Sequence, residues 1–317
     1  MKLTRLFVIP LAALLLTSCT TSGRGGGGGG GGGGGSYTPG EIENGAYDGY
    51  YDLKTYNLNK YSGPELIREI HRMMLDTHHT LVRYAQFSQY TKQTADREYS
   101  VDQVDAATKK NQFFYTGSEN SLSTSYTREH VWPCASSGGM WVHKNYTDIK
   151  YYVDHSAYVG GGSDLYHVRP CNSHVNTARG DSKFVEFTAE EKKSMIQEKD
   201  SGAKYVLLCD SDEYSNYSEP ADEFKGDCAR IIFYVYVHYA KIGNYNWDDY
   251  CGALNLKDVI GKNGSTKEEI YDQLIRWNNI DPVSETEKLR NNTVQAIQGN
   301  RNPFVDYPSL LDRCLVL

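Results

Sequence analysis

The sequence has no excess of positive charge. Lys and Arg together number 33 and Asp and Glu number 40, which gives a formal net charge of −7 at pH 7. A uniformly basic surface for binding a polyanion is therefore excluded. Any anionic partner would have to be attracted by a local cluster of cations or by a bound metal ion.

Several common catalytic motifs are also missing. The absence of CxxC argues against a zinc ribbon or a thioredoxin-type site. HExxH, GxSxG and GxxxxGK[ST] do not occur, which argues against zincins, serine hydrolases with a nucleophile elbow and P-loop nucleotidases. An HxxEH zinc site fails as well, because Tyr126 stands where its first histidine would be.

The N-terminus has the layout of an export signal. Lys2 and Arg5 precede an apolar run from Leu6 to Leu16, which is too short to span a bilayer comfortably. We predict that residues 1–18 are a lipoprotein-type signal peptide and that Cys19 becomes the lipidated first residue, anchoring the protein to a membrane. An ordinary cleaved signal is the alternative. The mature protein would lie in the outer membrane, periplasm or cell surface, or be secreted.

An unbroken glycine run from Gly25 to Gly35 follows. Such a run buries no side chains, so residues 19–36 are expected to be a tether, or else a low-complexity insertion without a role. Residues 37–317 are enough for one domain with an ample core, which we expect to be monomeric. Six cysteines besides Cys19 permit disulfides in an exported protein, but their pairing cannot be read from the sequence.

Hydrophobic periodicity predicts a mostly helical α+β domain with a small sheet near its middle. The helix beginning at Pro64 has apolar residues at helical spacing, and the one beginning at Cys228, after Asp227 as its cap, is apolar nearly all round. Ser284 and Glu287 form a capping-box pattern. The predicted helices cover residues 64–87, 228–243, 266–278 and 284–297, and the predicted strands cover 127–132 and 163–168.

The segment REHVWPC places Glu129 and His130 side by side at the end of a predicted strand. Neighbours on an extended strand point to opposite faces. A bend or twist near Trp132 and Pro133 is therefore needed before both side chains can approach one reacting group.

The second informative segment is SDLYHVRPCNSHVNTARGDSKF. Pro170 is expected to end the strand, and from there the spacing becomes helical, with Asn172, Asn176, Arg179 and Lys183 on one polar face. His174 points about 200° away from Asn176, so the two should not bind the same ion.

A strand with Glu129 and His130, a second strand and a helix with Asn176 follow the order of a ββα-metal nuclease site. Cleaving a phosphodiester needs an activated water, charge neutralisation at the phosphate and help for the leaving oxygen. A neutral imidazole near its pKa can take the proton from water. We therefore predict His130 as the general base and Glu129 and Asn176 as oxygen ligands of one hard divalent cation.

Five blocks, REHVWP, DLYHVRP, VNTARGD, EPADEFKGDCARIIFY and QGNRNPFVDYP, resemble the bacterial endonuclease I family of His-Me finger nucleases, over about Tyr50 to Pro308. The resemblance implies a ββα-metal finger with His130 as base and Glu129 and Asn176 on the metal, usually Mg²⁺, with Mn²⁺ or Ca²⁺ as substitutes. It also implies cleavage of DNA, and in some members RNA, with little sequence preference and with 5′-phosphate products.

The sequence departs from this family at two points. Tyr166 replaces a histidine found in many members, and His167 is left either to hydrogen-bond within the finger or to lie near the metal. The loop from Ala135 to Gly162 lacks an arginine for the product phosphate and has only Lys144 and Lys150 as cations. Arg179 is the candidate for that contact, unless it forms a salt bridge that fixes the helix.

Two rival functions remain open. One is a ribonuclease of the same fold, which contacts to the 2′-OH would distinguish. The other is a non-catalytic surface lipoprotein that binds nucleic acid, glycan or a host protein. Retention of Glu129, His130 and Asn176 argues against this second rival, because a binding protein has no need of all three.

Overall fold

The computed structural model describes residues 41–90, 101–102, 110–121, 124–133, 160–197, 206–209, 216–240 and 254–316 of the chain, without the side chains of 194–197 and 206–209. These residues belong to one compact unit, Pro39–Leu317. The predicted signal peptide, tether and lipidated Cys19 lie outside the described residues, as do Lys144 and Lys150.

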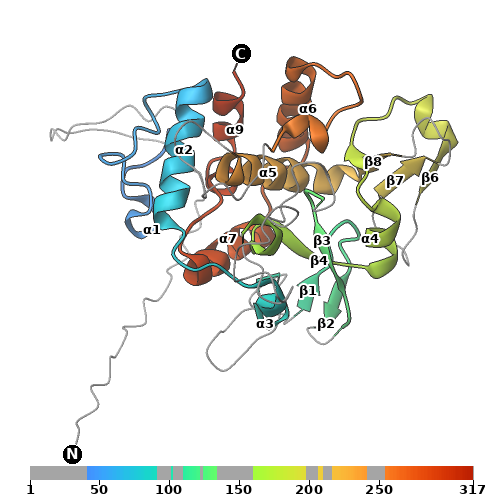
Figure 1. Ribbon diagram of the computed structural model, residues 1–317, viewed down its shortest axis with the longest axis horizontal. Helices are drawn as coiled ribbons and strands as arrows, with labels where there is room; N and C mark the ends of the chain where they lie inside the picture. Colours follow the sequence, from blue (N-terminus) through green and yellow to red (C-terminus); the bar gives the residue numbers. More distant parts are fainter. Residues whose placement is uncertain are drawn as a thin grey trace, which may run out of the picture. The chain divides into compact units, whose positions relative to one another are not determined.

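The predicted α+β class is confirmed, since the described residues form helices and small sheets, with β6, β7 and β8 on the opposite side of the view from α2 (Figure 1). None of the helices in the described ranges is both long and apolar enough to span a membrane. The helices are α1 Ala46–Gly49, α2 Gly63–Thr77, α3 Phe87–Tyr90, α4 Ser173–Arg179, α5 Asp222–Tyr239, α6 Lys267–Ile280, α7 Glu285–Gln298, α8 Pro303–Asp306 and α9 Ser309–Cys314, with 3-10 turns η1 Tyr84–Gln86, η3 Gly161–Ser163, η4 Glu191–Ser194 and η6 Leu256–Asp258.

The strands form three small sheets in the described part of the chain. Strands β1 and β2 pair antiparallel, β3 and β4 pair antiparallel, and the four-stranded sheet has the order β5-β8-β7-β6, in which only β5 and β8 are parallel. Their bounds are β1 Lys110–Gln112, β2 Glu119–Ser121, β3 Thr127–His130, β4 Val168–Cys171, β5 Lys183–Phe184, β6 Met195–Gln197, β7 Val206–Cys209 and β8 Tyr217–Pro220.

Helix α5 is the centre of the core. It packs against α2, α6 and α8, and Figure 1 shows it crossing between α2 and α6. The predicted burial is confirmed, but the helix begins at Asp222 rather than at Cys228, and Asp227 is inside it rather than its cap. Acidic Asp222 and Glu223 in the first turn favour this earlier start, because they complement the helix dipole. Cys228 and Cys314 are buried free thiols.

The first predicted helix is too long. Helix α2 ends at Thr77, because the next segment hydrogen-bonds to the end of α7. The backbone N–H groups of His79 and Thr80 donate to the carbonyl of Gln298. A contact remote in sequence thus overrides the local pattern. Helices α6 and α7 agree closely with their predicted ranges, and the Ser284–Glu287 capping box is confirmed.

The second predicted strand is misplaced. Residues 163–168 turn instead, because Asp164 accepts N–H groups from the residues that follow it, and the strand is β4, which contains Pro170. Pro170 therefore does not end the strand. It pairs with Arg128 in a ladder of only two strands, and its carbonyl accepts the Phe114 N–H at 2.8 Å, so a missing N–H is tolerated.

Gly226 in α5 provides a test of this packing. A Cβ at this position would overlap the Asp281 carbonyl oxygen and lie 2.7 Å from an Arg230 nitrogen. Alanine gains about 0.5–1 kcal/mol of helix propensity, but overpacking against backbone costs ~1–3 kcal/mol. Gly226→Ala should therefore lower the free energy of unfolding measured with urea. Exposed Asn279→Ala on α6 is the control, and a Gly226→Ala protein as stable as the wild type would contradict the packing.

Candidate active site

Strands β3 and β4 and helix α4 form a ββα unit. Glu129 pairs with Arg169 and His130 with Val168 across the two strands. Helix α4 is held against β3 by the Asn176 amide, whose Nδ2 donates to Thr127 Oγ1 at 2.9 Å and to the Arg128 carbonyl at 3.1 Å. The unit thus joins the two sequence segments that were predicted to share a site.

The Glu129 carboxylate is buried and fixed from one side. Its Oε1 accepts the Tyr115 hydroxyl at 2.5 Å and Arg179 at 3.2 Å. Its Oε2 has no partner among the described residues, so this oxygen is the one available to an ion. Burial raises the pKa of Glu129, while Arg179 and the Tyr115 hydrogen bond oppose that rise.

Tyr115 is a part of this site that sequence reasoning missed. Its backbone has φ +65°, a left-handed conformation that is unfavourable for a bulky residue and costs roughly 1–3 kcal/mol. The strain is balanced by the fully buried ring and by the bond to Glu129. Among 26 tyrosines, nothing in the pattern singles out this one.

The structure places Arg179 in a supporting position. Its side chain is 1% exposed, and its guanidinium donates to Glu129 and to the carbonyls of His130, Val131 and Gly180. A side chain enclosed in this way does not reach a product phosphate. The geometry therefore fits the salt-bridge alternative, in which Arg179 ties α4 to the end of β3.

His130 is held in a defined tautomer by the backbone. Its Nε2 lies 2.8 Å from the Gly162 carbonyl, which can only accept, so Nε2 carries the proton and Nδ1 is the basic nitrogen of the neutral ring. The ring stacks on Tyr84 at 5.8 Å and lies 5.5 Å from His167. This packing desolvates the ring and lowers the pKa of His130 to about 4, well below the near-physiological value expected from sequence.

His167 is engaged at both ring nitrogens. Nδ1 donates to the Gly161 carbonyl at 2.7 Å, and Nε2 accepts the Trp132 N–H at 2.9 Å. Neither nitrogen faces an ion in this arrangement, which fits the role of hydrogen bonding within the finger. These bonds hold Trp132 in the bend that directly follows β3.

Asn176 and Glu129 lie on the same side of β3. Asn176 bonds to Thr127 Oγ1, and Thr127 and Glu129 are two residues apart on a strand, so their side chains share a face. Because the amide nitrogen is used, the amide oxygen is left as the ligand atom. A carboxylate oxygen and an amide oxygen form a hard donor set that fits Mg²⁺, Mn²⁺ or Ca²⁺. His130 points to the other face.

The remaining candidate residues at and after α4 do not come together with Glu129 and Asn176. Asn172 is the helix cap, and its Oδ1 accepts the N–H groups of His174 and Val175. Lys183 does not share the predicted face, because Gly180 at φ +57° ends the helix and Lys183 lies in β5, where its Nζ donates to Asn263 at 2.8 Å. His174 is exposed on α4.

A model of the endonuclease I family matches residues 66–309, which is more than half of the chain. The chain belongs to the endonuclease I family. Two relatives are named extracellular ribonuclease. The one from Bacillus subtilis (strain 168) is 29% identical over 83% of this chain and 79% of its own length, and the one from Bacillus amyloliquefaciens is 31% identical over 82% and 78%. The predicted family is confirmed.

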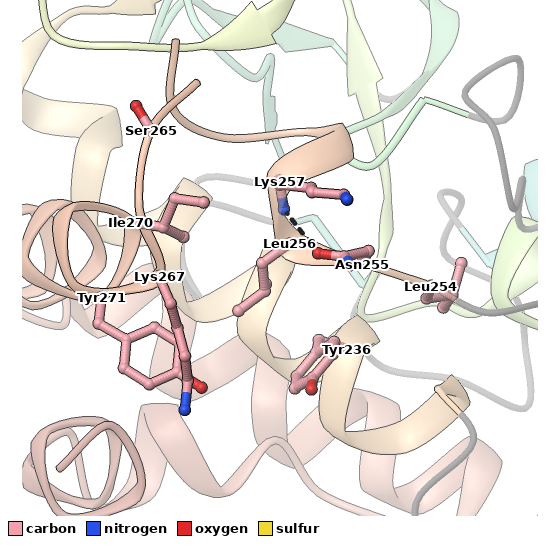
Figure 2. Close-up of a pocket in the computed structure, with 9 residues that line it drawn as sticks. All are labelled: Tyr236, Leu254, Asn255, Leu256, Lys257, Ser265, Lys267, Ile270 and Tyr271. Atoms are coloured by element: carbon pink, nitrogen blue, oxygen red, sulfur yellow. Dashed lines mark hydrogen bonds between the residues drawn. The ribbon is translucent and has the colours of Figure 1, made fainter. Parts of the chain in front are cut away.

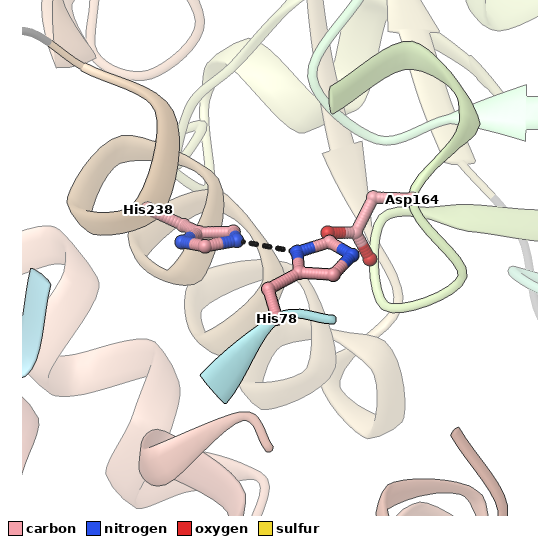
Figure 3. A group of neighbouring side chains, drawn as sticks. All are labelled: His78, Asp164 and His238. Carbon is pink, nitrogen blue, oxygen red and sulfur yellow. Dashed lines mark hydrogen bonds between the residues drawn. The ribbon is translucent and has the colours of Figure 1, made fainter. Parts of the chain in front are cut away.

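This endonuclease I family chain has a second group of side chains that could hold a metal ion, formed by His78, Asp164 and His238 (Figure 3). Their ligand atoms lie within 4.8 Å of one another. The group is also hydrogen-bonded as it stands. His78 Nε2 can donate to the Thr80 carbonyl, so its Nδ1 accepts from His238 at 2.9 Å. Asp164 accepts hydroxyls from Tyr234 and Tyr239. An ion would have to displace the bond between the two histidines.

A surface pocket of about 360 Å³ lies between the end of α5 and the start of α6 (Figure 2). Tyr236, Tyr271 and Lys267 are among its lining residues, and the Lys267 ammonium lies 5.0 Å from the centre of the Tyr271 ring. None of the residues predicted for catalysis or metal binding lines it, so the pocket is distinct from the ββα unit.

Tyr115→Phe tests how the Glu129 carboxylate is oriented. Loss of the bond to Oε1 should weaken binding of Mg²⁺ by about 10- to 100-fold, because the carboxylate is no longer held with Oε2 available. Isothermal titration calorimetry measures this affinity. Tyr166→Phe is a matched control, since this buried hydroxyl bonds to the Asn291 and Asn300 carbonyls away from Glu129. Equal Mg²⁺ affinities in the wild type and Tyr115→Phe would contradict the account.

NMR titration of the His130 ring tests its desolvation. The folded ring should protonate near pH 4, and the ring in the urea-unfolded chain near its ordinary value of 6.5. Between these two pKa values the His130 ring is protonated in the unfolded chain and neutral in the folded one. His130 therefore lowers the free energy of unfolding as the pH falls through this window. A folded-state midpoint near 6.5 would show that the ring is open to water.

Proposed function

We propose that this chain is an exported, metal-dependent endonuclease that hydrolyses phosphodiester bonds of DNA and RNA with little sequence preference and leaves 5′-phosphates. The observation that carries the proposal is the ββα unit itself. It presents the oxygens of Glu129 and Asn176 on one side of β3 and a neutral His130 on the other.

The proposed chemistry divides between the two sides of the strand. His130, with its proton on Nε2, takes a proton from the attacking water at Nδ1. Glu129 Oε2 and the Asn176 amide oxygen would hold the divalent ion, with Mg²⁺ as the expected ion. When bound, that ion supplies charge neutralisation at the phosphate and the leaving oxygen. Arg179 and Tyr115 keep the carboxylate in place.

RNA is a substrate that a specific observation favours. Both Bacillus relatives are named extracellular ribonuclease. Their names also agree with export, which the signal layout of residues 1–18 favours independently. We further propose that Cys19 carries a lipid anchor, that residues 19–36 are a tether, and that residues 37–317 act as a monomeric nuclease domain in scavenging or degrading external nucleic acid.

Substitution of His130 tests the base. His130→Ala should lower the cleavage rate by ~10²- to 10⁴-fold while nucleic acid binding largely survives. Glu129→Ala or Asn176→Ala should lower activity and Mg²⁺ affinity together. His174→Ala, exposed on α4 and turned away from Asn176, is the control. Near-normal turnover of His130→Ala would remove His130 from the role of base.

The substrate class is tested by one matched digestion series. Purified wild-type protein is incubated with single-stranded DNA, double-stranded DNA and RNA at one salt concentration, with Mg²⁺ or with EDTA. We expect Mg²⁺-dependent cleavage of both DNA and RNA. Cleavage of RNA alone would establish the ribonuclease alternative, and binding without cleavage would establish the non-catalytic one.

A further inference from the structure

Arg128 shares a face of β3 with His130. The two residues alternate with Thr127 and Glu129 along the strand, so their side chains project to the side opposite the Glu129 carboxylate. Tyr84 joins them, since the Arg128 guanidinium lies 4.2 Å from the centre of its ring and the His130 ring stacks on it at 5.8 Å and 23°. A cation is thereby fixed beside the proposed base.

Arg128 has no acidic partner among the residues that the structure describes. The ββα unit contains three arginines, and the other two are buried with acidic partners, Arg169 with Asp102 and Arg179 with Glu129. Arg128 is partly exposed, and in the described part of the chain its guanidinium has neither an ion pair nor a hydrogen bond. Its contacts are the aromatic faces of Tyr84 and Phe87.

A partly exposed arginine held by aromatic rings is suited to an anion. Its N–H groups form a planar fork that matches a phosphate. The cation–π contact already restricts the side chain, so less conformational entropy is lost on binding. A chain with a net charge of −7 needs such a local cation to attract a polyanion.

We propose that Arg128, held over the ring of Tyr84, binds a phosphate of the nucleic acid strand that is cleaved at His130, and so sets substrate affinity. This inference rests on the proposed nuclease function. It assigns Arg128 the phosphate contact that buried Arg179 does not reach. The side of β3 that holds the base then also binds the nucleic acid strand.

The test measures binding separately from cleavage. In a His130→Ala background, which prevents cleavage, a short fluorescein-labelled DNA strand is titrated by anisotropy over a salt series. Adding Arg128→Gln should raise Kd about tenfold or more and reduce the slope of log K against log salt by about 0.7, the value for one single-strand phosphate contact. Arg128→Lys should retain the slope, because the charge remains.

Arg68→Gln is the matched control, because Arg68 is an exposed arginine on α2 paired with Glu65. In the otherwise wild-type enzyme, Arg128→Gln should raise KM more than it lowers kcat. Unchanged Kd and salt slope in Arg128→Gln would overturn the inference. If that variant does not fold, an unchanged Kd in Tyr84→Ala, in which the Arg128 guanidinium has lost the ring that supports it, would overturn the inference instead. Failure of the wild type to bind or cleave nucleic acid would refute the proposed function itself.

Discussion

The buried ion pair between Arg179 and Glu129 is the interaction on which the ββα unit depends. It connects α4 to β3, and the same guanidinium holds the carbonyls of His130 and Val131 as the chain leaves the strand. Both side chains are 1% exposed, so removing one partner would leave an uncompensated charge at a cost of roughly 3–5 kcal/mol. Tyr115 completes the arrangement by donating to the same carboxylate oxygen.

This constraint separates the two tasks of the proposed site. One oxygen of Glu129 is occupied by protein, and the other, with the Asn176 amide oxygen, would hold the proposed ion. Across the strand, the Gly162 carbonyl fixes the His130 tautomer and burial keeps the ring neutral. The protein thus fixes the position and the protonation state of the His130 ring before substrate binds, as electrostatic preorganisation requires. The cost is a strained backbone at Tyr115.

Local signals in the sequence predicted what local physics determines. The Ser284–Glu287 capping box, the buried α5 and the strand ending in Glu129 and His130 follow from residue spacing. The positions that could not be predicted depend on contacts remote in sequence. Helix α2 ends early because His79 bonds to Gln298, and Tyr115 reaches Glu129 only after the chain has folded. Lys183 was misplaced because a positive φ at Gly180 ends α4.

The central claim is that Glu129 and Asn176 hold one divalent ion. The most direct measurement is an anomalous difference map from a crystal of the protein grown with Mn²⁺. The account predicts a peak between Glu129 Oε2 and the Asn176 amide oxygen. A peak at His78, Asp164 and His238 with none at Glu129 would contradict it.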